Sequence, residues 1–137
     1  MKIFIVRHAS AVERFSWNGD DTDRPLDDEG SNQSLMIAKY FSDTEISSIF
    51  SSAAVRCQQT IWPTAHQFGI QIELSNSLSE GSTSQTSDLV EKLAQGEISD
   101  ASPILCSHGD VISELIRSLT LKGMRTPKRK GFAKASV

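Results

Sequence analysis

Apolar and polar positions along the chain alternate between strand-like and helix-like patterns. Short apolar runs rich in β-branched residues indicate strands, whereas apolar residues spaced three and four positions apart indicate helices. Strands are predicted at residues 3–6, 46–52, 70–74, 103–107 and 132–137. Helices are predicted at residues 29–43, 53–69, 87–96 and 109–123, with a loop over residues 75–87. Because strands and helices alternate, the pattern predicts an α/β domain with a largely parallel sheet.

Individual residues refine these elements. The continuous apolar run at residues 3–6 is typical of a strand covered on both faces, whereas the alternation at residues 70–74 favours an edge or half-covered strand. Gly69 is expected to close the second helix, and Pro63 is expected to kink it. Ser87 is a candidate cap for the third helix.

Composition and charge exclude several classes of protein. The chain has 137 residues, 38% of them hydrophobic, and a net charge of −3, which describes one globular domain that is not built to attract nucleic acid or an anionic membrane. No run approaches the roughly 20 apolar residues of a membrane span, so the expected compartment is the cytoplasm. Cys57 and Cys106 lack CxxC spacing, which favours reduced thiols.

Polar residues follow the predicted strands where each strand ends. Arg7 and His8 follow the first strand, Arg56 lies just after the second, Glu80 lies in the loop after the third, and His108 follows the fourth. Ligands of open α/β sheets bind outside the carboxyl ends of the strands, so these groups are expected to converge on one pocket. Such a pocket suits a phosphoryl group, because arginine matches its oxygens and histidine can attack its phosphorus.

Four motifs carry a family resemblance: "FIVRHAS", "SSAAVRCQQT", "LSEG" and "ILCSHGD". In this order the chain resembles the histidine phosphatase superfamily from residue 2 to about residue 137. The segment "WNGDDTDRPLDDEG" is similar to the SixA-like phosphohistidine phosphatases, and even more to the histidine phosphatase domain that follows a Nudix domain in some nucleotide-cleaning hydrolases. The resemblance implies a phosphoglycerate mutase-like fold, with residues 1–137 forming one three-layer domain around a mostly parallel central sheet flanked by helices.

The resemblance also implies a role for each candidate residue. His8 matches the nucleophile that becomes a transient phosphohistidine, and Arg7 and Arg56 match the two arginines that bind the phosphoryl oxygens. His108 matches the second histidine of the pocket, a hydrogen-bond donor to the same oxygens. Glu80 matches the position of a general acid that protonates the leaving group.

Three further implications concern the pocket and the branch of the family. Gly109 begins a helix whose N-terminal amides favour an anion, and it is predicted to bind phosphate with the two arginines and two histidines. Ala9 replaces the glycine common after the nucleophile, which points to the SixA-like branch. No metal or cofactor is expected, because the three histidines lack ligand spacing and a phosphohistidine mechanism requires none.

Three functions are compatible with these residues. The first is a protein phosphohistidine phosphatase of the SixA type, whose partner is a phosphorylated protein. The second is a phosphatase for a small phosphorylated metabolite, such as a nucleotide, a sugar phosphate or a polyphosphate. The third is a module that recognises phosphate without turnover. No nucleic-acid or membrane partner is expected in any of the three.

Some residues allow a plainer interpretation. Glu80 is equally compatible with a solvated loop, and His108 taken alone is compatible with a helix cap. His66 lies in mid-helix and is assigned to structure. The basic stretch from residue 122 to 134 is either solvated or meets a polyanionic substrate. Four residues of one loop either line the pocket or fold on themselves: Trp17, Asp20, Asp21 and Arg24.

Overall fold

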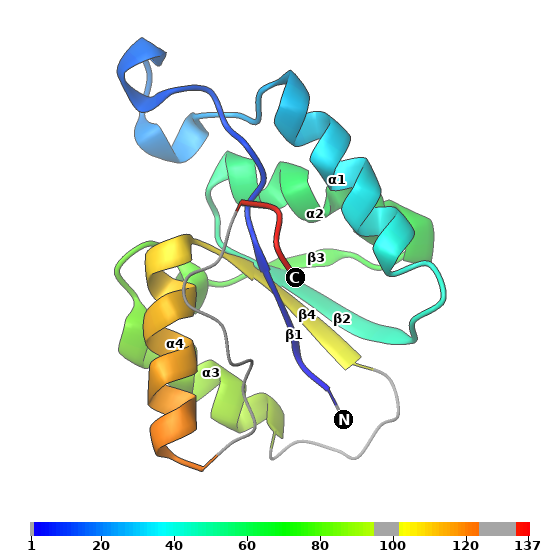
Figure 1. The fold of residues 1–137 in the computed structure, drawn as a ribbon, viewed down its shortest axis with the longest axis vertical. Coiled ribbons are helices and arrows are strands. Elements are labelled where there is room, and N and C mark those ends of the chain that lie inside the picture. Colours follow the sequence, from blue (N-terminus) through cyan, green and yellow to red (C-terminus); the bar gives the residue numbers. More distant parts are fainter. Residues whose placement is uncertain (1, 95–101, 124–133) are drawn as a thin grey trace.

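Strands and helices alternate along the chain, as the sequence pattern predicts (Figure 1). The computed structural model describes residues 2–94, 102–123 and 134–137. The strands are β1 (Phe4–Arg7), β2 (Ile46–Ser51), β3 (Ile72–Leu74) and β4 (Ser102–Ser107). The helices are α1 (Asp28–Tyr40), α2 (Val55–Phe68), α3 (Thr83–Ala94) and α4 (Gly109–Leu121). Short 3-10 helices lie between them: η1 (Arg14–Ser16), η2 (Asp21–Asp23) and η3 (Asn76–Leu78).

The strands form one parallel sheet in the order β1-β4-β2-β3. Parallel pairing brings all carboxyl ends to one edge of the sheet, and the register sets Arg7 beside Ser107. The chain leaves β1, β2 and β4 at this edge. The segments that follow these three strands carry the predicted site residues His8, Arg56 and His108. The predicted parallel sheet is therefore confirmed among the described residues.

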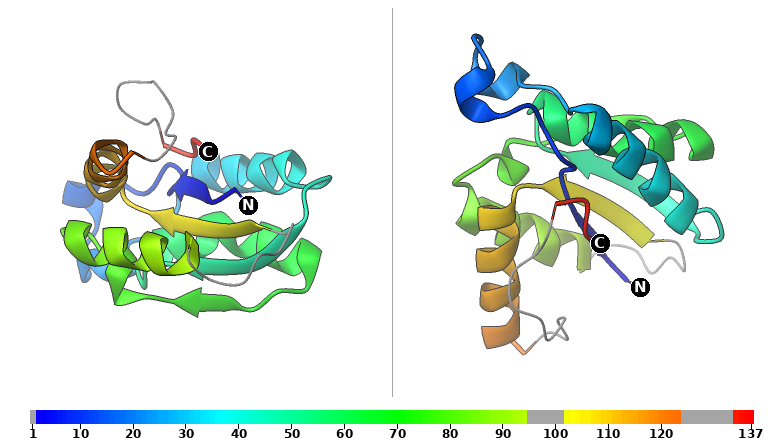
Figure 2. Two further views of the ribbon diagram at one scale, coloured as in Figure 1. Left: turned by 90° about the horizontal axis from the view of Figure 1, so that it is seen from below. Right: turned by 45° about the horizontal axis from the view of Figure 1, so that its top comes forward.

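Helices cover both faces of the sheet (Figures 1 and 2). On one face, α1 and α2 pack onto the strands through a core that includes Ile37, Ile61 and Ile104. On the other face, α3 and α4 pack through Val90 and Leu115. The predicted three-layer α/β architecture is confirmed.

The first strand combines an edge position with two covered faces. β1 lies at one edge of the sheet, yet Phe4 packs into the core beneath α1 and α2, while Ile5 packs into the core beneath α3 and α4. This arrangement explains its continuous apolar run. β3 forms the opposite edge, in agreement with the alternation of its sequence.

Two glycines allow the observed backbone paths at the end of α2 and in the first turn of α1. α2 continues through Pro63 and ends at Gly69, whose φ of 64° provides the left-handed helix end predicted for it. In α1, a Cβ built on Gly30 would lie 1.9 Å from the carbonyl oxygen of Ser10. Only glycine allows α1 to approach the chain this closely just after His8.

Two predicted elements differ from the structure. α3 begins at Thr83, four residues earlier than predicted, so Ser87 lies inside the helix rather than at its cap. Thr86 and Ser87 are buried there, and this packing outweighs the loop-like composition. Residues 134–137 of the predicted last strand form no strand, because Ala135 has a φ of 60°, outside the extended region. Residues 132–133 of that strand lie outside the described residues.

None of the helices that the structure describes is long and apolar enough to cross a membrane. Most of the basic stretch, residues 124–133, is outside the described residues.

Candidate active site

The strand ends bring the two predicted histidines together. The backbone amide of His8 donates to the carbonyl oxygen of Ser107 at 3.0 Å, which extends the pairing of β1 with β4 by one residue. His108 follows Ser107 at the start of α4. The rings of His8 and His108 therefore meet edge to face, with centroids 5.5 Å apart.

A hydrogen bond fixes the tautomer of His8. Its Nδ1 lies 2.8 Å from the carbonyl oxygen of Ala9, and because a carbonyl oxygen only accepts, Nδ1 carries the ring proton. Nε2 consequently keeps its lone pair. The amide of Ala9 donates in turn to Thr60 Oγ1 at 2.8 Å, and the Thr60 hydroxyl donates to the carbonyl oxygen of Arg56. The backbone carrying His8 is thus tied to the first turns of α2.

Burial keeps the His8 ring neutral. The residue is 8% exposed, and removal of the charged ring from water lowers its pKa from 6.5 to about 4. The nearby charges of His108, Arg56 and Arg7 lower the pKa further, while the bond to Ala9 opposes them. A neutral ring with a free Nε2 is the form of histidine that can attack an electrophile.

Arg56 presents a buried guanidinium beside these rings. Its side chain is 2% exposed, and its Nη1 donates to the backbone carbonyl oxygen of Asp21 at 2.9 Å. Its Nη2 lies 3.4 Å from Nδ1 of His108 and 3.2 Å from Oδ2 of Asp21. Its Nε is buried and has no hydrogen-bond partner among the described residues, so one donor remains for a ligand oxygen.

His108 is held on both sides of its ring. Nδ1 faces Arg56, whereas Nε2 lies 2.9 Å from Oγ of Ser52 and 3.7 Å from Sγ of Cys57. His108 occupies the N-cap position of α4 but makes no side-chain capping bond. Its ring is therefore directed into the site rather than toward the helix end. Ser52 is an addition to the predicted site, and its only sequence signal is its place in the motif "SSAAVRCQQT".

Arg7 lies against the first residue of α4. A Cβ built on Gly109 would lie 2.8 Å from Cζ of Arg7, so the guanidinium packs directly on the backbone of Gly109. The glycine therefore allows a close approach of cation and helix start. The amides and dipole of this helix start favour an anion at the same place.

The carboxylate of Glu80 also reaches the site. Its Oε2 lies 3.6 Å from Nη2 of Arg56, and its Oε1 lies 3.3 Å from Nη2 of Arg14. The side chain is 47% exposed, which leaves it open to a leaving group and to water. The structure thus brings together Arg7, His8, Arg56, Glu80, His108 and Gly109, all of the residues predicted for the site.

Asp21 belongs to this cluster although the sequence places it only in a nearby loop. Its carboxylate pairs with Arg56 at 3.2 Å, Arg24 at 3.0 Å and Arg14 at 3.5 Å. Partial burial alone would raise the pKa of Asp21, but the hydrogen bond from Arg24 and the charges of the arginines lower it. Arg14 carried no sequence signal, since it lies in no motif. Asp20 instead caps η2 and accepts from Trp17 through its backbone carbonyl.

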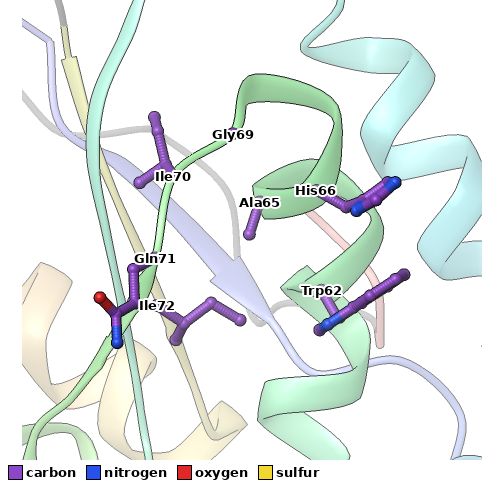
Figure 3. A pocket seen from close by; sticks show the side chains of 7 residues that line it. All are labelled: Trp62, Ala65, His66, Gly69, Ile70, Gln71 and Ile72. Carbon is purple, nitrogen blue, oxygen red and sulfur yellow. The ribbon is translucent and has the colours of Figure 1, made fainter.

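The remaining side chains considered for the site are His66 and the two cysteines. His66 is exposed and stacks on Trp62, with ring centroids 4.9 Å apart, beside a hollow near the last turn of α2 (Figure 3). Arg56 lies in the first turn of the same helix, at the opposite end. Cys57 and Cys106 are both buried, and both are free thiols that form no disulfide. Among the residues that the structure describes, no three His, Cys, Asp or Glu side chains form a group suited to a metal ion.

Comparisons with known proteins identify the family of this chain. The model of the histidine phosphatase superfamily (branch 1) matches residues 3–101. An 8-oxo-(d)GTP phosphatase from Mycolicibacterium smegmatis is 28% identical over 136 residues, which cover 98% of this chain. The chain spans 42% of the length of that relative.

Solved structures share the fold. The protein histidine phosphatase SixA complexed with tungstate has a TM-score of 0.75 and 24% identity, covering 87% of this chain and 76% of its own. A putative SixA from Agrobacterium tumefaciens has a TM-score of 0.73 and 21% identity, covering 97% and 86%. A mycobacterial glucosyl-3-phosphoglycerate phosphatase complexed with VO3 has a TM-score of 0.76 and 16% identity, covering 97% and 87%.

Proposed function

The chain belongs to the histidine phosphatase superfamily, and from this premise we propose that it hydrolyses phosphorylated substrates through a phosphohistidine at His8. The observation that carries the proposal is the state of the His8 ring. Its proton is held on Nδ1 by Ala9, its Nε2 has no hydrogen-bond partner among the described residues, and the buried cation of Arg56 lies close enough to lower its pKa. This combination provides a nucleophile next to a group that binds phosphoryl oxygens.

In the first step, the Nε2 lone pair of His8 attacks phosphorus. The bond from phosphorus to the leaving group breaks, and the leaving group takes the proton of the Glu80 carboxyl group. Arg7 and Arg56 neutralise the phosphoryl oxygens, and His108 donates a hydrogen bond to them, as negative charge spreads over these oxygens in a loose, in-line transition state.

In the second step, water hydrolyses the phosphohistidine. Glu80, now a carboxylate, accepts a proton from the water while the oxygen attacks phosphorus. The bond from phosphorus to Nε2 breaks, its electron pair returns to the His8 ring, and inorganic phosphate leaves. Side chains and the start of α4 supply the positive charge in both steps, so the proposed chemistry needs no metal or cofactor.

The charges around Arg56 favour a phosphorylated histidine of a protein as the substrate. The Asp21 carboxylate beside Arg56 adds a negative charge to the site, and Glu80, which also lies beside Arg56, becomes a second one once it has given up its proton. An imidazole leaves as a neutral group once it is protonated, whereas a polyphosphate leaves with several negative charges. Because like charges repel at these distances, the site suits the imidazole better. This argument supports the SixA-like assignment, with a phosphorylated protein as the partner in the cytoplasm.

A nucleotide is the second candidate substrate. The relative from Mycolicibacterium smegmatis, an 8-oxo-(d)GTP phosphatase by name, aligns with 98% of this chain. This chain spans only 42% of the length of that relative, so its activity is carried over here only as a candidate. A sugar phosphate is a related possibility, because the glucosyl-3-phosphoglycerate phosphatase has the same fold.

The experiment that tests the proposal compares wild-type protein with His8→Ala and His66→Ala. Wild type and the His66 variant are expected to hydrolyse p-nitrophenyl phosphate and to yield an acid-labile, base-stable phosphoenzyme. The His8 variant is expected to lose at least about 1,000-fold in kcat/KM and to form no phosphoenzyme, because the nucleophile is absent. Full activity of His8→Ala would refute the mechanism.

A substrate panel then separates the candidate functions. It contains a phosphorylated histidine phosphotransfer domain, nucleoside di- and triphosphates, and glucosyl-3-phosphoglycerate. We expect the highest kcat/KM with the phosphohistidine protein. A preference for a nucleotide would establish the second candidate instead. Phosphate binding by a wild-type protein that turns over no substrate would indicate a recognition module.

A further inference from the structure

Four charged side chains at the site form a closed ring of ion pairs: Arg14, Asp21, Arg56 and Glu80. Arg56 Nη2 lies 3.2 Å from Oδ2 of Asp21, and Oδ1 of Asp21 lies 3.5 Å from Nε of Arg14. Nη2 of Arg14 lies 3.3 Å from Oε1 of Glu80, whose Oε2 lies 3.6 Å from Nη2 of Arg56. The ring joins α2 to the segment of η1 and η2 and to the loop after η3.

Within this ring, Asp21 contacts Arg56 in two independent ways. The backbone carbonyl oxygen of Asp21 accepts from Nη1 at 2.9 Å, while its carboxylate pairs with Nη2. Removal of the carboxyl charge therefore leaves one of the two contacts in place. The guanidinium also stays enclosed, since the Arg56 side chain is 2% exposed.

The carboxylate of Asp21 is itself held in place. Nε of Arg24 donates to its Oδ1 at 3.0 Å, and Nη1 of Arg24 donates to the carbonyl oxygen of Val12 at 2.6 Å. The Arg24 side chain is only 9% exposed, so this anchor lies within the fold. A negative charge is thus fixed next to Nη2 of Arg56.

We propose that the charge of the Asp21 carboxylate limits the affinity of the site for phosphate. The inference rests on the proposed function, which assigns Arg56 to the phosphoryl oxygens. The Asp21 carboxylate pairs with Nη2 of Arg56. Its negative charge repels the negative charge of a phosphoryl group that binds to the same guanidinium. Two arginines and two histidines without this opposing charge would retain the product, so Asp21 promotes the release of inorganic phosphate.

The test measures binding of inorganic phosphate by titration calorimetry at fixed pH and ionic strength. Asp21→Asn keeps the shape of the side chain and the backbone contact but removes the charge. We expect it to bind phosphate roughly 5- to 10-fold more tightly than wild type, a modest gain because the carboxylate is partly exposed. In turnover, we expect kcat and KM of the variant both to fall, as slower product release requires.

The matched control is Asp23→Asn, which removes the same charge two residues away. Asp23 is exposed in η2, and no ion pair joins it to a described residue. This variant is expected to bind phosphate as wild type does, and Asp21→Glu, which restores the charge, is expected to do so within about twofold. Asp21→Ala serves as the second neutral variant if Asp21→Asn does not fold.

Unchanged or weaker phosphate binding by both neutral variants of Asp21 would overturn the inference, since it would show that the carboxylate only orients Arg56. An equal gain in Asp23→Asn would also overturn it, because the effect would then follow net charge alone. Phosphate binding is measured without turnover. A wild-type protein that binds phosphate without hydrolysing substrate would therefore refute the proposed function and still allow this test.

Discussion

The chemistry of His8 depends on a single hydrogen bond and on its burial. The carbonyl oxygen of Ala9 holds the proton on Nδ1, and the low exposure of the ring disfavours a second proton. Neither property follows from histidine itself, whose ordinary pKa lies near neutrality. The fold thus converts a residue that is half protonated near pH 6.5 into one that is neutral across the physiological range.

The pKa of His8 can be tested by following its ring Cε1–H signal in NMR as the pH falls. We expect a midpoint near pH 4. The sign of the linked stability change follows. The unfolded chain takes up this proton near pH 6.5 and the folded protein only near pH 4, so stability falls as the pH is lowered through that window. A midpoint near 6.5 would contradict the explanation from burial.

At this scale the sequence predicted the residues of the site better than it predicted their environment. Arg7 ends β1, and His8 and His108 directly follow β1 and β4, so their positions depend only on the sheet. Asp21 pairs with Arg56, and Arg14 pairs with Asp21, because of the backbone path of η1 and η2, which no apolar period describes. Residues in such loops could be assigned to the site only after the three-dimensional path of the loop was known.

At the scale of the elements, the connection between β4 and α4 is a single residue of the site. β4 ends at Ser107 and α4 begins at Gly109, so only His108 lies between strand and helix. Both elements were predicted to within one or two residues, since each has a clear apolar pattern. α3 was predicted less well, because the buried hydroxyl residues Thr86 and Ser87 carry no apolar signal.

Gly109→Ala tests how closely this junction fits Arg7. The new Cβ would lie 2.8 Å from Cζ of Arg7, so the guanidinium must shift, and we expect kcat/KM to fall about 10- to 100-fold. The melting temperature is expected to change little, because the displaced atoms end a flexible side chain and alanine is the better helix former. Enzyme kinetics and thermal unfolding measure the two effects.

Ser113→Ala, on an exposed position of the same helix, is the control for Gly109→Ala. It is expected to leave both activity and melting temperature close to the wild-type values. A Gly109 variant with full activity would show that Arg7 adjusts without loss, and that its contact with α4 does not position it for the reaction.

At the scale of the whole molecule, the site exists only once distant segments have been assembled. His8, Arg56, Glu80 and His108 come from four parts of the chain that meet through the parallel sheet. The alternation of elements predicted the parallel sheet, but it left the strand order open. That order depends on which crossovers pack best, and it places β4 between β1 and β2, so that His108 can contact both His8 and Arg56.

Because the site links these segments, a phosphate ligand is expected to stabilise the whole fold. Binding at one hundred times the dissociation constant adds about 2.7 kcal/mol to the free energy of unfolding, which raises the melting temperature by several degrees. Thermal unfolding in phosphate, compared with sodium chloride of equal ionic strength, measures the shift. We expect wild type and His66→Asn to show it in full, and Arg56→Gln to show little, since these two positions lie at opposite ends of α2. An equal shift in Arg56→Gln would place the phosphate outside the cluster of His8, Arg56 and His108.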